Sequence, residues 1–132
     1  MKEVQGFLFT ALLFIFIVFS IDYIFNVEEV LASDNQSAMI KKISKDYSKK
    51  FCNSIAFGLS KESAMIFSLE ENKKIFEKRK GVKNINRELI AEDIAISVAD
   101  NCGFLINING EEDIQEFRNY YLLKDKESSE KG

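Results

Sequence analysis

Apolar residues after residue 33 recur at steps of three and four, the spacing of one helix face. The pattern predicts four helices, which start at Asp34 or Ser37, at Ser60, near Asn86 and at Glu111, with glycines 58, 81 and 103 closing the first three. Residues 104–110 read as extended. The sequence therefore predicts an all-α fold, a compact bundle of about four helices over residues 33–123. Residues 124–132 are polar and are expected to form a flexible tail.

A different pattern precedes this domain. Residues 7–21 carry no charge, and the apolar run reaches Val27 if Asp22 lies at an interface. This length fits the core of a signal peptide, and Val30-Leu31-Ala32 offers a small-residue cleavage site, so we expect cleavage between Ala32 and Ser33. The alternative is an uncleaved membrane anchor that contacts the bilayer through residues 7–27.

Positive charge near the apolar run sets the expected orientation. Lys2 lies before the run, whereas the first basic residue after it is Lys41, so the N-terminus should stay inside and the domain be exported. The lysines that begin at Lys41 also leave an inverted orientation open. A third alternative is a pilin-like leader cut between Gly6 and Phe7, although Ala11 stands where such leaders carry glutamate.

The two cysteines belong to the first and third predicted helices. Short connections make consecutive helices antiparallel, so these two helices should run parallel and end at the same end of the domain. Cys52 and Cys102 both lie near those ends. We therefore predict a disulfide between them in an oxidising compartment, and two buried thiols if the domain is cytoplasmic.

Composition removes several kinds of chemistry. The chain has no histidine, so it has no imidazole base, no Ser-His or Cys-His pair and no histidine metal ligand. A structural metal site usually takes four ligands, and two cysteines fifty positions apart do not supply them. The acidic residues from Glu111 to Glu116 suit the start of a helix without any bound cation. We predict no catalytic residue, metal or cofactor.

Charge is balanced across the domain but unevenly placed. Residues 33–132 carry 17 basic and 17 acidic side chains, so nucleic acid is not an expected partner. Most basic residues precede residue 88 and most acidic ones follow it. Five lysines decorate one flank of the first helix and could contact a partner or anionic lipid: Lys41, Lys42, Lys45, Lys49 and Lys50. The alternative is a solvated helix face.

Aromatic residues of the domain are mostly phenylalanine. Six are available to the core: Phe51, Phe57, Phe67, Phe76, Phe104 and Phe117. No exposed aromatic platform is predicted.

Two stretches carry a resemblance to a group of proteins. Residues 47–76, YSKKFCNSIAFGLSKESAMIFSLEENKKIF, and residues 98–104, VADNCGF, resemble small uncharacterised exported proteins of picocyanobacteria over roughly residues 40–106. The resemblance implies a periplasmic or thylakoid-lumenal location. It brings no catalytic residues.

These observations favour a non-enzymatic, exported helical module that binds a protein partner, as an accessory to a membrane complex. The alternatives are a small enzyme that uses lysine and carboxylate chemistry, and a minor pilin-like protein.

Overall fold

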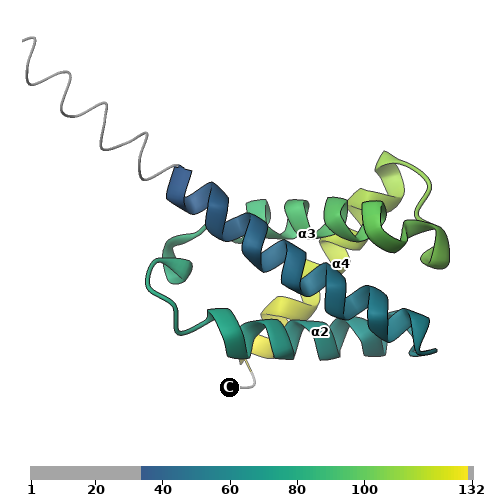
Figure 1. The fold of residues 1–132 in the computed structure, drawn as a ribbon, viewed down its shortest axis with the longest axis horizontal. Helices are drawn as coiled ribbons and strands as arrows, with labels where there is room; N and C mark the ends of the chain where they lie inside the picture. Colours follow the sequence, from purple (N-terminus) through teal and green to yellow (C-terminus); the bar gives the residue numbers. More distant parts are fainter. Residues whose placement is uncertain (1–33, 131–132) are drawn as a thin grey trace, which may run out of the picture. The chain divides into compact units, whose positions relative to one another are not determined.

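The computed structural model describes residues 34–130, which contain four α-helices and no β-strand (Figure 1). The helices are residues 34–56, α2 (Lys61–Phe76), α3 (Arg87–Cys102) and α4 (Glu111–Glu130), with short 3-10 helices at Val82–Asn84 and Gly103–Ile106. The all-α prediction is confirmed for these residues. The predicted signal or anchor segment and the junction of Ala32 with Ser33 lie outside them.

None of the helices within residues 34–130 is long and apolar enough to span a membrane. The first helix already includes residue 34, so Ser37 lies inside it and does not cap it. Residues from Gln36 onward belong to one compact unit.

Local polar groups set the starts of α2 and α3, as the sequence predicted. The Ser60 side chain accepts a hydrogen bond from the Ser63 backbone N–H at 3.2 Å, and Asn86 caps α3 through Glu88 at 2.8 Å. Each of these bonds satisfies a backbone donor that the helix itself leaves unpaired.

Helix ends are less well predicted than helix starts. Gly58 and Gly81 have left-handed φ angles of 91° and 89°, but α2 ends at Phe76, so a turn separates the helix from Gly81. Gly103 is right-handed and begins a 3-10 helix, and the left-handed residue is Asn107. The expectation of an extended segment over residues 104–110 was therefore wrong at its start. A backbone bond from the Ile108 N–H to the Gly103 carbonyl, 2.9 Å long, closes this turn.

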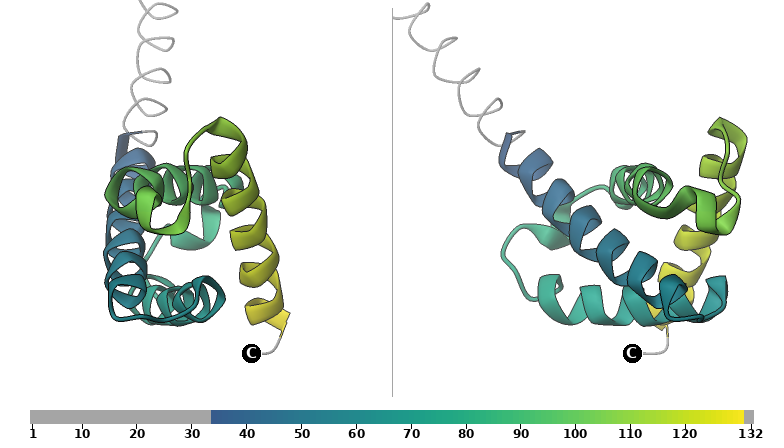
Figure 2. Two further views of the ribbon diagram at one scale, coloured as in Figure 1. Left: turned by 90° about the vertical axis from the view of Figure 1, so that its right-hand side faces the viewer. Right: turned by 45° about the vertical axis from the view of Figure 1, so that its right-hand side comes forward.

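Paired side chains show that the first helix and α3 run in the same direction (Figures 1 and 2). Ser44 donates a hydrogen bond to Asp93, and Ser97 donates one to Ser48 at 2.8 Å. The two residues of each pair are 49 positions apart in sequence. Because this offset is the same in both pairs, the two helices run parallel. The predicted parallel arrangement is thus confirmed.

Aromatic rings pack α4 against the first helix. Tyr47 meets Tyr121 edge to face at 5.2 Å between ring centroids, and Phe51 meets Phe117 in the same way at 5.3 Å. The two contacts lie one helical turn apart on each helix, and α4 crosses the first helix at a steep angle (Figures 1 and 2). These rings lie at the centre of the hydrophobic core, together with residues of α2 and α3: Met65, Leu69, Ile94 and Val98.

The C-terminal residues correct the prediction of a flexible tail. Helix α4 continues through the predicted boundary at residue 123 to Glu130. Asp125 is buried and forms ion pairs with Lys73 of α2 and Arg87 of α3, while Lys124 pairs with Glu62 at 3.2 Å. These cross-helix ion pairs hold a segment whose polar composition alone suggested a frayed end.

Candidate functional site

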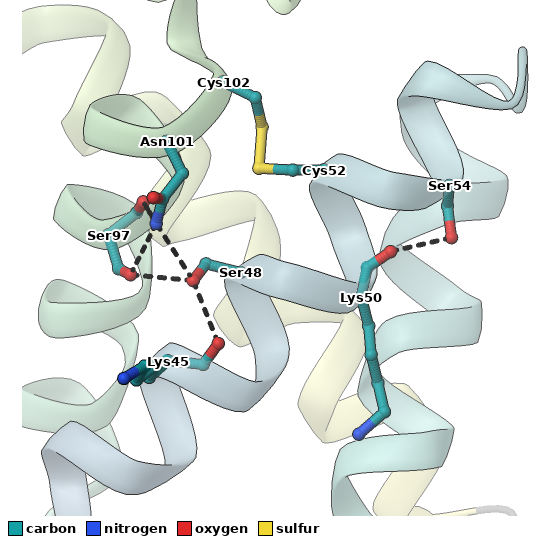
Figure 3. Close-up of a disulfide and its surroundings, with 8 residues drawn as sticks. All are labelled: Lys45, Ser48, Lys50, Cys52, Ser54, Ser97, Asn101 and Cys102. Atoms are coloured by element: carbon teal, nitrogen blue, oxygen red, sulfur yellow. Dashed lines mark hydrogen bonds between the residues drawn. A yellow bond between two sulfur atoms is a disulfide. The ribbon is translucent and has the colours of Figure 1, made fainter.

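A disulfide between Cys52 and Cys102 joins the first helix to α3 (Figure 3). The two Cα atoms are 5.7 Å apart, within the range that an unstrained bridge needs. One turn earlier, Ser48 accepts hydrogen bonds from Ser97 and from Asn101, the latter at 3.3 Å. The bridge therefore continues the row of polar contacts that aligns the two helices, and the predicted pairing is confirmed.

The predicted lysine cluster divides into two parts. Lys41, Lys42, Lys45 and Lys49 are exposed, lie within about 100° around the helix axis and form no ion pair within residues 34–130. We call these four residues the lysine stripe. Lys50 lies outside this arc and pairs with Asp46 of its own helix. The structure thus brings four of the five lysines to one exposed face.

Two phenylalanines expected in the core are the most exposed large apolar residues in the described chain. Phe57 is 86% exposed and Phe104 is 76% exposed, whereas Phe51, Phe76 and Phe117 are buried. Phe57 follows Cys52 by five residues and Phe104 follows Cys102 by two, so the disulfide keeps both near the same end of the domain. Leu59 and Leu105, which are also exposed, follow the same two cysteines, and we call these four residues the apolar end.

A pocket of about 310 Å³ lies near the other end of α2, beside the connection to α3. Residues of all four helices and of this connection line it: Ile43, Asn72, Lys73, Phe76, Glu77, Val82, Lys83, Ile85, Arg87, Ile90, Tyr121 and Asp125. Both apolar and charged side chains contribute to this lining. The pocket and the apolar end are separated by the length of α2, whose 16 residues span about 24 Å.

Asp125 is the charged centre of the pocket. Its side chain is only 6% exposed, and one carboxylate oxygen lies 3.1 Å from the Lys73 ammonium while the other contacts the Arg87 guanidinium. Asn72, also buried, donates hydrogen bonds to the Ile43 carbonyl and to Asp46, each 3.0 Å long. The deepest polar groups of the pocket are therefore engaged with the protein itself.

Tyr121 forms part of the pocket wall. Burial raises the pKa of its hydroxyl above the usual value, and the charge of Asp125 acts in the same direction. The phenol therefore stays neutral over the physiological range. It contributes an aromatic surface rather than a charge.

Comparison with known proteins finds no matching family model, no similar curated protein and no similar solved structure. Within residues 34–130, no group of three or more acidic or cysteine side chains is arranged to hold a metal ion. The site must therefore be interpreted from its own residues.

Sequence reasoning missed the apolar end and the pocket for different reasons. Phe57 lies beyond the end of the first helix and Phe104 beyond the end of α3, and neither continues the three-and-four apolar spacing, which was a signal that they do not face the core. Asp125 lies in a stretch so polar that nothing marked it as buried. Its partners Lys73 and Arg87 are distant in sequence, so only the fold reveals them.

Proposed function

We propose that this chain is an exported, non-enzymatic helical module that binds a protein partner through its apolar end, as an accessory to a membrane complex. The observation that carries the proposal is the exposure of Phe57 and Phe104 beside the disulfide. Covering a phenylalanine side chain is worth about 1.5–3 kcal/mol, which is a substantial gain for a partner. Grouped apolar residues on a surface are typical of interaction sites.

The disulfide supports the proposed compartment. Such bridges persist in oxidising spaces such as the periplasm and are rare where thiols are kept reduced. The apolar run of residues 7–27 agrees with export, either as a signal peptide or as an anchor. The bridge also restrains the segments that carry Phe57 and Phe104. These segments would therefore lose little conformational entropy when a partner binds.

The chemistry of the pocket gives no support to the enzyme alternative. A general base must reach the substrate's proton, but Asp125 is buried, with one oxygen accepting from Arg87 and the other 3.1 Å from the Lys73 ammonium. Lys73 donates to Asp125 and to Ser129, so its ammonium is held as a charge partner. Tyr121 is kept protonated by burial.

Site-specific photocrosslinking in cells that produce the protein tests the proposal. A photoreactive phenylalanine analogue replaces Phe57 or Phe104 in turn, and Phe67, an exposed phenylalanine of α2, serves as the control position. We expect the same partner to be crosslinked from positions 57 and 104, and little from position 67. The purified partner should then bind the Phe57→Ser, Phe104→Ser double variant at least tenfold more weakly than the unchanged chain, and Phe67→Ser with unchanged affinity.

Equal crosslinking from all three positions, or unchanged affinity of the double variant, would contradict the proposal. Circular dichroism of each variant shows whether it keeps its helical content. Because the substituted phenylalanines are already exposed, we expect no loss of fold.

A further inference from the structure

We infer that the pocket beside Asp125 binds a small organic anion: a compact apolar body that carries one carboxylate or phosphate-ester group. This ligand is distinct from the protein partner proposed above, because the pocket and the apolar end lie at opposite ends of α2. The inference therefore does not rest on that proposal. Three properties of the pocket carry it.

The first property is an apolar floor. Ile43, Phe76, Ile85 and Ile90 line the pocket, and each is buried. Its volume of about 310 Å³ lies at the lower end of the range of about 300–1,000 Å³ that is usual for small-molecule sites. The floor suits a single ring or a short branched chain.

The second property is a cationic rim with donors to spare. Lys73 donates hydrogen bonds to the Asp125 carbonyl and the Ser129 hydroxyl, and its ammonium lies 3.1 Å from an Asp125 carboxylate oxygen, so it is directed at α4. Lys83 lines the pocket and forms no ion pair within residues 34–130. Arg87 uses one terminal nitrogen for Asp125 and is 60% exposed, so its other N–H groups face outward. Against these two cations the rim offers one acidic residue, Glu77.

The third property is that the Asp125 carboxylate holds the Arg87 side chain in place. The buried Asp125 carboxylate holds the guanidinium at the mouth of the pocket, which limits the rotamer freedom that a ligand would otherwise have to remove. A guanidinium presents a planar fork that matches the two oxygens of a carboxylate or a phosphate. A ligand with its apolar part on the floor and its anionic group between Arg87 and Lys83 would satisfy both halves of the site.

Calorimetric titration of the full chain tests this inference. The probe is 3-phenylpropionate, compared with its neutral isostere 3-phenylpropionamide, with 2-phenylethyl phosphate and with inorganic phosphate. We expect saturable binding of one 3-phenylpropionate or one 2-phenylethyl phosphate per chain. The amide should bind at least about tenfold more weakly because it forms no charge-assisted bonds, and inorganic phosphate should bind more weakly still because it lacks the apolar part.

Variants locate the bound probe. Lys83→Gln should weaken the better anionic probe about two- to fivefold, the loss expected for one exposed ion pair, while leaving the fold unchanged. Lys126→Gln removes the same charge from an exposed position of α4 that does not line the pocket, and should leave binding unchanged. Val82→Trp should fill the pocket and abolish binding.

Any of three results would overturn the inference. One is binding of the amide as tight as that of the acid, which would show that the rim does not select an anion. The second is the absence of saturable binding by both anionic probes, and the third is binding that survives Val82→Trp in a folded variant. A preference between the carboxylate and the phosphate ester identifies the class of anionic group.

Discussion

Tyr47 combines full burial with an unpaired polar atom. Its hydroxyl has no hydrogen-bond partner within residues 34–130, and its ring packs against Phe51 and Tyr121. Burial raises the pKa of this hydroxyl well above the usual value, and the neighbouring Tyr121 adds to the shift. The ring of Tyr47 fills the core, whereas its buried, unpaired hydroxyl lowers the stability of the fold.

Replacing Tyr47 with phenylalanine should therefore keep or raise stability. Removing a buried, unsatisfied hydroxyl avoids a cost of about 1–3 kcal/mol, and the ring contacts remain. Urea unfolding at pH 7 measures the change. Tyr120→Phe is the control, because Tyr120 is only partly buried and its hydroxyl lies near the Glu62 carboxylate, so this change should bring no gain. A clear loss of stability in Tyr47→Phe would mean that the hydroxyl has a partner.

The raised tyrosine pKa values also predict alkaline sensitivity. Tyr47 and Tyr121 titrate near pH 10 in the unfolded chain but at higher pH in the folded one. As the pH rises above about 10, the unfolded state loses these protons first, so the free energy of unfolding falls. Urea midpoints from pH 8 to 11 should decline above pH 10, and the decline should be shallower in Tyr47→Phe. An equal slope in both proteins would contradict this assignment.

Helix α4 shows what holds an element of low hydrophobicity. Its middle turns bury Phe117 and Tyr121, and its last turns are held by charge, through Lys124 with Glu62 and Asp125 with two cations. The sequence correctly placed its start, because acidic residues favour a helix N-terminus. Its end could not be read from periodicity, since the contacts that extend it come from α2 and α3.

Asp125→Ala should destabilise the fold by about 2–3 kcal/mol. Loss of one partner from a fully buried ion pair costs about 3–5 kcal/mol, and the exposure of Arg87 reduces this figure. Glu127→Ala is the matched control. It removes a partner of Lys124 that is far more exposed than Asp125, and it should cost less than about 1 kcal/mol. Urea midpoints compare the two. Equal effects would show that residues 124–130 contribute little to stability.

The whole domain is closed by one covalent bridge across a sequence separation of 50 residues. Its pairing was predictable because helix direction follows from the order of short connections. The apolar end was not predictable, because apolar composition is compatible with either a core or an exposed surface. Periodicity identified the helices, but only the packed structure shows which apolar residues remain outside.

The Cys52→Ser, Cys102→Ser double variant should lose about 4 kcal/mol of stability. This is the chain-entropy value for a closed loop of about fifty residues, and it avoids a leftover thiol. Thermal or urea unfolding without reductant measures it. Addition of reductant to the unchanged protein should give a similar loss, and a stability that responds to neither change would contradict the role of the bridge.

The leader can be tested on the mature protein. We expect export followed by cleavage between Ala32 and Ser33, so the intact mass should correspond to a chain that starts at Ser33. A mass that includes residues 1–32 would indicate an anchor. A start at Phe7 would instead favour the pilin-like alternative.

The position of the bridge has a consequence for proteolysis. Cys52 precedes and Cys102 follows the connection between α2 and α3, where Lys78, Arg79 and Lys80 are exposed. Trypsin should cut there before it cuts the helices, and the two fragments should stay joined, separating on a gel only after reduction. A protease that reaches this connection would interrupt the chain without releasing either half.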